Sequence, residues 1–181
     1  HEEEAFFLLL GIFTNTNYCE IFYKDLYKLK QYFVIFEKAI SIKLPECQQY
    51  LSTSLINASF YSSPWFITLF TISLQNIIDY DNPKFLLTIW DNFMIHGWSA
   101  IINAGLVIMK CYSEDILMLK FEDVLHFLIN DVIRTGFIQN INHQKFLKLY
   151  LSIEFSSEVF SAIEYISLAD DKNTTNKQAA R

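Results

Sequence analysis

The side chains that could carry chemistry in this chain are few and far apart. Its four histidines lie outside any HExxH zinc motif, at His1, His96, His126 and His143. Asp123 and His126 form a lone pair three residues apart, whereas a metal site inside a helical bundle needs several converging carboxylates. We therefore expect no metal site and interpret this pair as part of a solvated surface.

Motifs for a nucleophile or a bound cofactor are missing as well. The three cysteines, Cys19, Cys47 and Cys111, are widely spaced and never form a CxxC pair, which argues against a disulfide framework or a thiolate zinc site. No serine lies in a GxSxG elbow. The four glycines, at positions 11, 97, 105 and 136, cannot form a phosphate loop or a dinucleotide fingerprint. We expect no cofactor and no catalytic residue.

Charge and targeting signals narrow the class of protein. The formal net charge is -6, and the two arginines are Arg134 and Arg181, so nucleic acid is not an expected partner. The cysteine usage fits a reducing, intracellular compartment. The acidic start at His1–Glu4 is unlike a signal peptide and lacks an initiator Met, so we expect the chain to be part of something longer. The uncharged stretch 92–109 is interrupted by polar residues and glycines, which favours a buried segment over a membrane span.

The elements that must hold these residues are predicted to be helices throughout. With 181 residues, of which 52% are hydrophobic, the chain can form one folded domain. Apolar residues recur every three or four positions, and no window alternates as a strand does, so the predicted class is all-α with no significant sheet. The clearest stripe runs from Leu26 to Leu44. Pro45 should stop that helix and open the next, which extends to about Ser54.

Two further helix starts share one pattern, a polar residue followed by proline. Ser63-Pro64 and Asn82-Pro83 are predicted to open helices of roughly 12 and 13 residues. Gly97 lies where a left-handed C-terminal cap is expected. The helix from Trp98 to Tyr112 is apolar on nearly every face, so we predict that it forms the centre of the core.

The last third of the chain is predicted to continue as helices and then to lose order. Ser113 should cap a short helix, and residues 121–134 form an amphipathic helix that Gly136 closes. Asn142 should cap a final helical stretch, residues 143–168. Residues 169–181 have no apolar periodicity, and we expect them to be a disordered tail.

The most informative segments are SSPWFITLF at 62–70 and LLTIWDNFMIHGW at 86–98. Their aromatic residues recur on one helix face, which predicts that the following lie mainly in the core: Trp65, Phe66, Phe70, Trp90 and Phe93. Asp91 follows Trp90 directly. We expect its carboxylate to accept hydrogen bonds and hold two helices in register, the alternative being a solvated position on the helix surface.

The order and spacing of these two segments resemble the TBC domain of Rab GTPase-activating proteins. The first segment is similar to the family's WFLTLF-like stretch and the second to its R-I-W-D-x-F-x-x-x-G signature. The resemblance extends from Glu3-Glu4-Ala5-Phe6-Phe7 to about residue 130, and Thr88 stands where the family usually has Arg. It implies that residues 1–168 are the C-terminal portion of a TBC domain, with five structural signature residues: Trp65, Phe66, Trp90, Asp91 and Gly97.

The same resemblance implies a mechanism to which this chain contributes no catalytic residue. Family members offer an Arg from an IxxDxxR motif and a Gln from a YxQ motif, and both motifs precede the E-E-x-A-F-W start. The Arg neutralises charge on the transferred phosphoryl group, while the Gln orients the attacking water. Arg134 and Gln139 resemble these motifs loosely, but they lie downstream of the Trp-Asp segment. We interpret Arg134 as an ordinary residue at a helix end.

The implied function is therefore regulatory. The resemblance predicts part of a protein that stimulates GTP hydrolysis on a GTP-bound Rab, cytoplasmic and peripheral to endomembranes through that partner, with this chain inactive alone. The alternative is a TBC-like scaffold that binds a GTPase or another partner without accelerating hydrolysis. An unrelated helical-bundle enzyme would need a converging carboxylate or histidine cluster, which the sequence does not contain.

Overall fold

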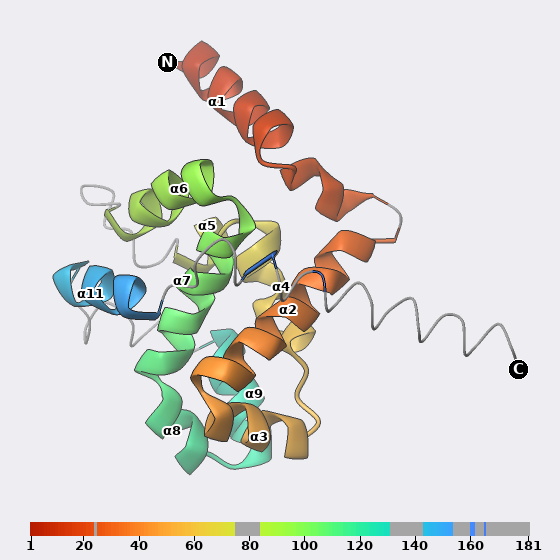
Figure 1. The fold of residues 1–181 in the computed structure, drawn as a ribbon, viewed down its shortest axis with the longest axis vertical. Coiled ribbons are helices and arrows are strands. Elements are labelled where there is room, and N and C mark those ends of the chain that lie inside the picture. The colour runs from red at the N-terminus through yellow and green to blue at the C-terminus, as the bar shows by residue number, and fades with distance from the viewer. Residues whose placement is uncertain (24, 75–83, 131–142, 154–159, 162–164, 166–181) are drawn as a thin grey trace, which may run out of the picture.

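The computed structural model describes residues 1–23, 25–74, 84–130, 143–153, 160–161 and 165, and within them it contains helices and turns but no strand. The all-α prediction is confirmed. The helices, labelled as in Figure 1, are α1 (Glu2–Asn15), η1 (Tyr18–Phe22), α2 (Tyr27–Lys43), α3 (Pro45–Thr53), α4 (Ala58–Ile67), α5 (Thr71–Leu74), α6 (Lys84–His96), α7 (Trp98–Cys111), α8 (Ser113–Met118), α9 (Phe121–His126) and α11 (His143–Ile153).

Helix α7 forms the centre of the core, as its sequence predicts. Every residue from Trp98 to Met109 is buried, and α2, α4, α6, α8 and α11 all pack against this helix (Figure 1). Gly105 makes the contact with α2 possible, because a Cβ there would lie 2.9 Å from the ring of Phe36. A side chain at this position would force the buried ring of Phe36 to shift.

Helices α2 and α3 also follow the sequence prediction. Leu29, Phe33, Phe36 and Ile40 of the apolar stripe are buried on the inner face of α2. Helix α2 ends at Lys43, and Pro45 is the first residue of α3. Proline is favoured there because the first helical N–H has no partner within the helix.

Helix α4 begins six residues earlier than the Ser63-Pro64 pattern predicts. It starts at Ala58, whose N–H donates to Glu37 Oε1 of α2 at 2.7 Å, and Pro64 lies inside the helix. The hydroxyls of Ser62 and Ser63 donate to backbone carbonyls one turn back, at 2.7 and 2.5 Å. Because these serines bond backwards rather than capping Pro64, the predicted start is wrong.

The same segment is also interrupted where a continuous helix was predicted. Helix α4 ends at Ile67, and Leu69 and Phe70 adopt positive φ angles of 47° and 65° before α5 begins at Thr71. Both of these side chains are buried. Left-handed backbone is costly for residues of this size, so their apolar contacts must hold the turn in place.

The C-terminal predictions are confirmed only in part. Ser113 is the first residue of α8 and donates back to the Lys110 carbonyl at 3.1 Å, so it does not cap the helix as predicted. Helix α9 begins at Phe121 as predicted, and residues 127–130 continue it as a π-helical turn. Helix α11 begins at His143 as predicted. The predicted Asn82-Pro83 start, Gly136, Asn142 and the tail 169–181 lie outside the described residues.

The uncharged stretch 92–109 is not one continuous helix. Gly97 divides it between α6 and α7, and its second half lies in the core. Across the part of the chain that the structure describes, no helix has both the length and the apolar character needed to span a bilayer.

Three tyrosine hydroxyls join segments that are far apart in the sequence. Tyr18 donates to the carbonyl of Ile67, Tyr50 to that of Leu119 at 2.5 Å, and Tyr150 to that of Ala100 at 3.3 Å. They connect η1 to the end of α4, α3 to the segment after α8, and α11 to α7. The carbonyls of Ile67 and Leu119 lie at helix ends, where α-helical bonding leaves them available, whereas Ala100 lies in the first turn of α7.

Candidate functional site

The five signature residues lie on α4, on α6 and at the junction of α6 with α7. Trp65 and Phe66 of α4 are fully buried, as predicted. The indole of Trp65 meets the ring of Phe36 with centroids 6.3 Å apart, and Phe66 stacks on Phe33 at 5.6 Å. These two residues therefore fix α4 against α2 by aromatic packing.

Trp98 is the centre of an aromatic cluster that the sequence patterns did not predict. Its indole stacks on Tyr32 with centroids 4.1 Å apart. Its ring centroid lies between 5.9 and 6.3 Å from those of Tyr18, Phe66 and Phe93. The sequence does indicate that Trp98 is buried, since it is a bulky aromatic residue at the start of the most apolar helix. Its partners on η1 and α2 could not be read from local spacing.

Trp90 is less buried than predicted. The side chain lies at the edge of the core, and its Nε1–H donates to the carbonyl of Leu69 at 3.1 Å. The hydroxyl of Tyr18 donates to the carbonyl of Ile67, which lies two residues before Leu69. An indole needs a partner for its N–H, and here that partner is the strained turn between α4 and α5. Trp90 therefore holds the turn by a hydrogen bond as well as by apolar contact.

Asp91 occupies the solvated position that was the alternative prediction. Its side chain is exposed, and within the described ranges no hydrogen bond reaches its carboxylate. Leu87 and Ile95, one turn before and after it on α6, are also exposed, so this face of the helix points outward. The expectation of a buried, hydrogen-bonded carboxylate is wrong for this chain.

Asp91→Asn is therefore expected to change the free energy of unfolding by less than about 0.5 kcal/mol. Among the described residues nothing pairs with this exposed carboxylate, so the substitution removes no interaction that they make. Urea unfolding at pH 7 measures the change. A loss above roughly 1 kcal/mol would show that Asp91 holds a partner in solution.

Gly97 ends α6 and begins α7. Its φ of 60° confirms the predicted positive φ, but its ψ of -142° lies outside the left-handed helical region. Its N–H donates to the Phe93 carbonyl at 2.8 Å, and its own carbonyl accepts from Ala100 at 3.0 Å. This conformation is open almost solely to glycine, which explains the residue type.

Gly97→Ala is expected to lower the free energy of unfolding by about 2 kcal/mol. The cause is backbone conformation alone, because a Cβ at Gly97 would meet nothing within 4 Å. Gly11→Ala in α1 is the matched control: its Cβ would touch only Asn15 at 3.9 Å, so it should stabilise the helix by roughly 0.5 to 1 kcal/mol. Denaturant midpoints moving in the same direction for both variants would contradict this interpretation.

Thr88, which stands where the family usually has Arg, connects α6 to α11. Its hydroxyl donates to the Lys84 carbonyl at 2.8 Å and lies 2.9 Å from His143 Nε2. The hydroxyl of Thr88 therefore lies within hydrogen-bonding distance of a helix carbonyl and of the imidazole at the same time. His143 also packs edge-on against Phe85, so a short polar side chain brings α11 against α6 here.

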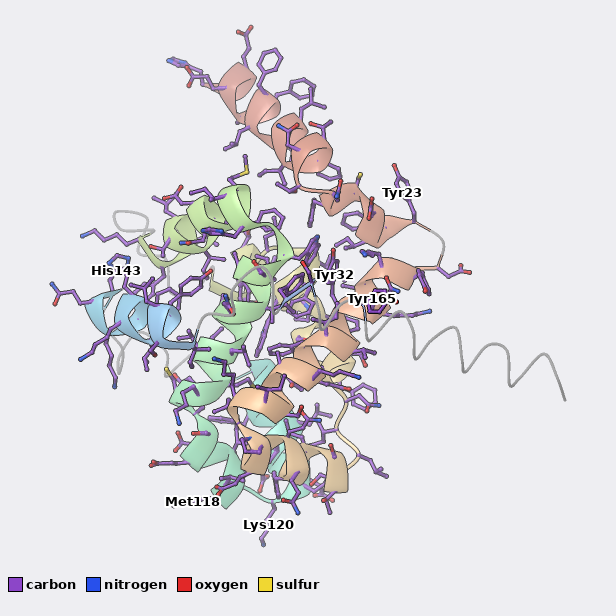
Figure 2. All side chains as sticks on the ribbon, in the orientation of Figure 1. Tyr23, Tyr32, Met118, Lys120, His143 and Tyr165 are labelled. Atoms are coloured by element: carbon purple, nitrogen blue, oxygen red, sulfur yellow. The ribbon has the colours of Figure 1, made fainter. Side chains whose placement is uncertain are left out.

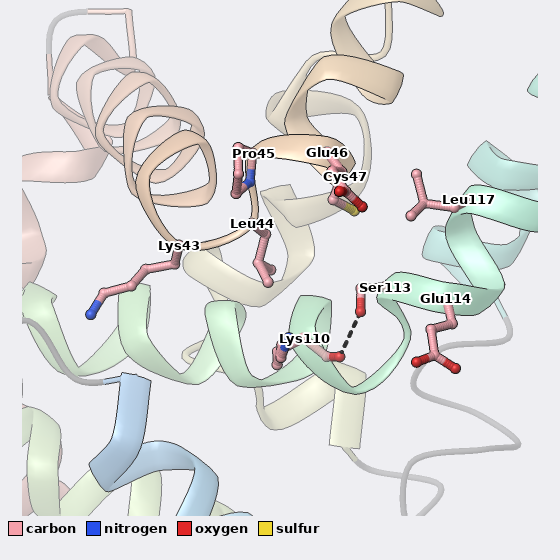
Figure 3. A pocket seen from close by; sticks show the side chains of 9 residues that line it. All are labelled: Lys43, Leu44, Pro45, Glu46, Cys47, Lys110, Ser113, Glu114 and Leu117. Carbon is pink, nitrogen blue, oxygen red and sulfur yellow. Dashed lines mark hydrogen bonds between the residues drawn. The ribbon is translucent and has the colours of Figure 1, made fainter.

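A cavity of about 320 Å³ opens where the end of α2 and the start of α3 face the α7–α8 junction (Figure 3). Its lining mixes cations and carboxylates, with Lys43 and Lys110 set against Glu46 and Glu114. Burial raises the pKa of the Cys47 thiol at its wall to about 11, so this thiol is protonated and a poor nucleophile at neutral pH. The cavity therefore offers no activated thiol.

Metal ligands do not gather in the fold either. Among the residues described, no group of three or more histidine, cysteine, aspartate or glutamate side chains could hold an ion. Arg134 and Gln139, the residues with a loose likeness to finger motifs, lie outside the described residues. Of the signature residues, Trp65, Phe66 and Trp90 act through packing, Trp90 and Gly97 also form hydrogen bonds to backbone carbonyls, and Asp91 is exposed.

Within the described residues, these features define an all-α domain with an aromatic core between α2, α4, α6 and α7. The chain belongs to the Rab-GTPase-TBC domain family, whose profile matches residues 1–117. The resemblance carried by the Trp65 and Trp90 segments is thereby confirmed.

Individual relatives are similar to most of the chain. GTPase-activating protein GYP5 of Saccharomyces cerevisiae is 24% identical over 153 residues, which is 84% of this chain and 16% of that protein. Ecotropic viral integration site 5 protein of Mus musculus is 27% identical over 128 residues, 70% of this chain and 15% of that protein. TBC1 domain family member 2A of Mus musculus is 29% identical over 119 residues, which is 66% of this chain and 12% of that protein. The chain thus spans a small part of the length of these relatives.

Proposed function

We propose that this chain is the C-terminal portion, residues 1–168, of the TBC domain of a Rab GTPase-activating protein. The protein binds a GTP-bound Rab and accelerates its hydrolysis of GTP, which ends a membrane-trafficking signal. It acts in the cytoplasm and reaches endomembranes through the Rab. The observation that carries this proposal is the family match over residues 1–117, together with the aromatic signature on α4 and α6.

Within that domain, this chain and the segment that carries the catalytic fingers have different roles. The arginine and glutamine fingers are supplied by motifs that precede the Glu3-Glu4-Ala5-Phe6-Phe7 segment in the family. The described part of this chain contains no arginine, because Arg134 and Arg181 both lie outside it. Its role is to provide the packed helical body against which the segment carrying the fingers is held. The fingers then stabilise the charge that develops on the γ-phosphoryl group.

The experiment is a GTP hydrolysis assay on the longer protein against a panel of purified, GTP-loaded Rab proteins. Acceleration of at least one Rab, lost when the upstream arginine is changed to alanine, supports the proposal. Binding to a Rab without acceleration, when both fingers are present in the sequence, overturns it in favour of a non-catalytic scaffold. Acceleration that survives removal of the upstream arginine also contradicts the assignment of the fingers.

A further inference from the structure

The α4–α5 segment, residues 58–74, is interrupted by a turn where its own sequence favours an unbroken helix. It contains no glycine, the residue that most often ends a helix through a left-handed position. Four of its apolar residues follow the spacing i, i+1, i+4, i+5, which an unbroken helix would also present on one face: Trp65, Phe66, Leu69 and Phe70. Two conformations of this segment can therefore direct the same side chains to the core.

The turn has the hydrogen bonds of a Schellman motif but an unusual residue at its left-handed position. The N–H of Phe70 donates to the carbonyl of Trp65 at 2.8 Å, and their rings stack with centroids 5.8 Å apart. The N–H of Leu69 donates to the carbonyl of Phe66 at 3.4 Å. Glycine or asparagine normally takes the left-handed position, which here is Leu69 with a φ of 47°. The turn is therefore costly and needs contacts from outside the segment.

The hydroxyl of Tyr18, on η1, binds one carbonyl that an unbroken helix would use itself. In such a helix the carbonyl of Ile67 accepts from the N–H of Thr71, four residues later. In the interrupted segment Thr71 donates instead to the carbonyl of Thr68 at 2.9 Å, and Tyr18 donates to Ile67. The bond from Tyr18 therefore takes the place of a helical bond.

The indole of Trp90, on α6, binds a second such carbonyl. In an unbroken helix the carbonyl of Leu69 would accept from Ser73, whereas here it accepts from Trp90 Nε1 at 3.1 Å. This carbonyl belongs to the peptide unit between Leu69 and Phe70, the two residues of positive φ. The N–H of the same peptide unit donates to the carbonyl of Trp65. Trp90 therefore fixes the orientation of the peptide unit on which the turn depends.

Because η1 and α6 bind the same turn, the two elements depend on each other. Element η1 lies at the edge of the molecule, where Tyr23, directly after it, is exposed at the surface (Figure 2). Withdrawal of Tyr18 would leave the Ile67 carbonyl available for a helical bond. Straightening of the segment would then turn the Leu69 carbonyl away from Trp90. The reverse holds as well, since the coupling between two contacts is reciprocal.

We propose that residues 58–74 form a two-state element that couples η1 to α6. In the interrupted state, which is the one observed, Tyr18 and Trp90 bind the carbonyls of Ile67 and Leu69. When either contact is lost, the segment becomes one helix and the other contact is lost with it. This proposal goes beyond the proposed function and does not depend on it, because it uses only the packing of α4, α5, α6 and η1.

The first test is a double-mutant cycle on the 181-residue chain, measured by urea unfolding. Tyr18→Phe and Trp90→Phe each remove a hydrogen-bond donor and keep an aromatic ring, so each should lower the folding equilibrium constant about fivefold. Because loss of one contact releases the other, the double variant should lose little more than either single variant. Independent contacts would multiply to a loss of about twenty-fivefold, and that result would overturn the proposal.

The matched control cycle combines Trp90→Phe with Tyr50→Phe. The hydroxyl of Tyr50 donates to the carbonyl of Leu119, which lies beyond the far end of α7, so the losses in this cycle should multiply. Equal coupling in both cycles would show that the turn is not its cause. A Tyr18→Phe/Trp90→Phe chain that fails to fold has lost more than either single variant, and it also overturns the proposal.

The second test observes the turn itself by NMR spectroscopy. The nuclear Overhauser effect between the amide proton and the Hα of one residue is strong at positive φ and weak in a helix, because φ sets the distance between the two protons. For Leu69 and Phe70 it should be strong in the parent chain and weak in the Tyr18→Phe/Trp90→Phe chain. Leu55, with a φ of 55° outside this segment, is the internal control and should stay strong. Strong effects at Leu69 and Phe70 in every variant would overturn the proposal.

Discussion

Mixed with a GTP-loaded Rab that the longer protein stimulates, the 181-residue chain alone is expected to leave the rate of GTP hydrolysis unchanged. The physical reason is that, in the proposed function, both fingers come from motifs outside this chain. An arginine offered in trans contributes on the order of 10³ to 10⁵ in rate, so its absence removes nearly all of the acceleration. Release of inorganic phosphate under single-turnover conditions measures the effect.

The control for this experiment is Arg134→Ala in the same chain. If Arg134 is not a finger, the variant and the parent chain should give the same basal rate. A hundredfold acceleration by the chain alone that Arg134→Ala abolishes would falsify the upstream assignment and make the downstream motif the catalytic one.

Trp65→Ala is expected to lower the free energy of unfolding by about 3 to 5 kcal/mol, as truncation of a fully buried tryptophan does. Only 1% of the Trp65 surface is exposed, and its indole meets the rings of Phe36, Tyr61 and Phe70. Removing it leaves a cavity between α4 and α2 that the surrounding helices cannot fill. Urea unfolding at one fixed protein concentration measures the loss.

Trp90→Ala is the matched comparison, because it removes the same side chain from a half-buried position. The expected loss is about 2 kcal/mol, part of it from the hydrogen bond to Leu69. Trp90→Phe keeps most of the apolar contact and should lose about 1 kcal/mol. Equal losses for Trp65→Ala and Trp90→Ala would contradict the difference in burial.

Sequence periodicity was sufficient to predict the fold class and the central helices. The stripe of α2 and the apolar character of α7 are local patterns: a stripe fixes which face of a helix is buried, and a helix that is apolar on every side must lie inside the core. The start of α3 at Pro45 could also be predicted, since proline is favoured at the first position of a helix whatever surrounds it. These features need no knowledge of what lies across the core.

The predictions that were wrong depend on contacts from distant parts of the chain. Helix α4 begins at Ala58 because Glu37, twenty-one positions earlier, accepts its N–H, and no local pattern reveals that partner. The turn at Leu69 and Phe70 is held by Tyr18 and Trp90, whose hydroxyl and indole reach it from η1 and α6.

Within the signature, residue type alone did not reveal which side chains are buried. Trp65 and Phe66 were predicted correctly because α4 is covered on the face that they share. Asp91 was not, because its burial depends on the rotation of α6 about its own axis. Leu87 and Ile95 on the same face are apolar yet exposed, so hydrophobicity misleads at this position.

The tyrosine hydroxyl bonds have a consequence for folding kinetics. They close loops of 49, 69 and 50 residues, so each can form only after the helices on both sides have docked. Interactions that are absent from the transition state slow unfolding without speeding folding. Tyr50→Phe should therefore raise the unfolding rate and leave the refolding rate unchanged. The slopes of both arms of the chevron plot should stay the same. These three hydrogen bonds then form after the folding transition state and lengthen the lifetime of the folded chain by slowing its unfolding.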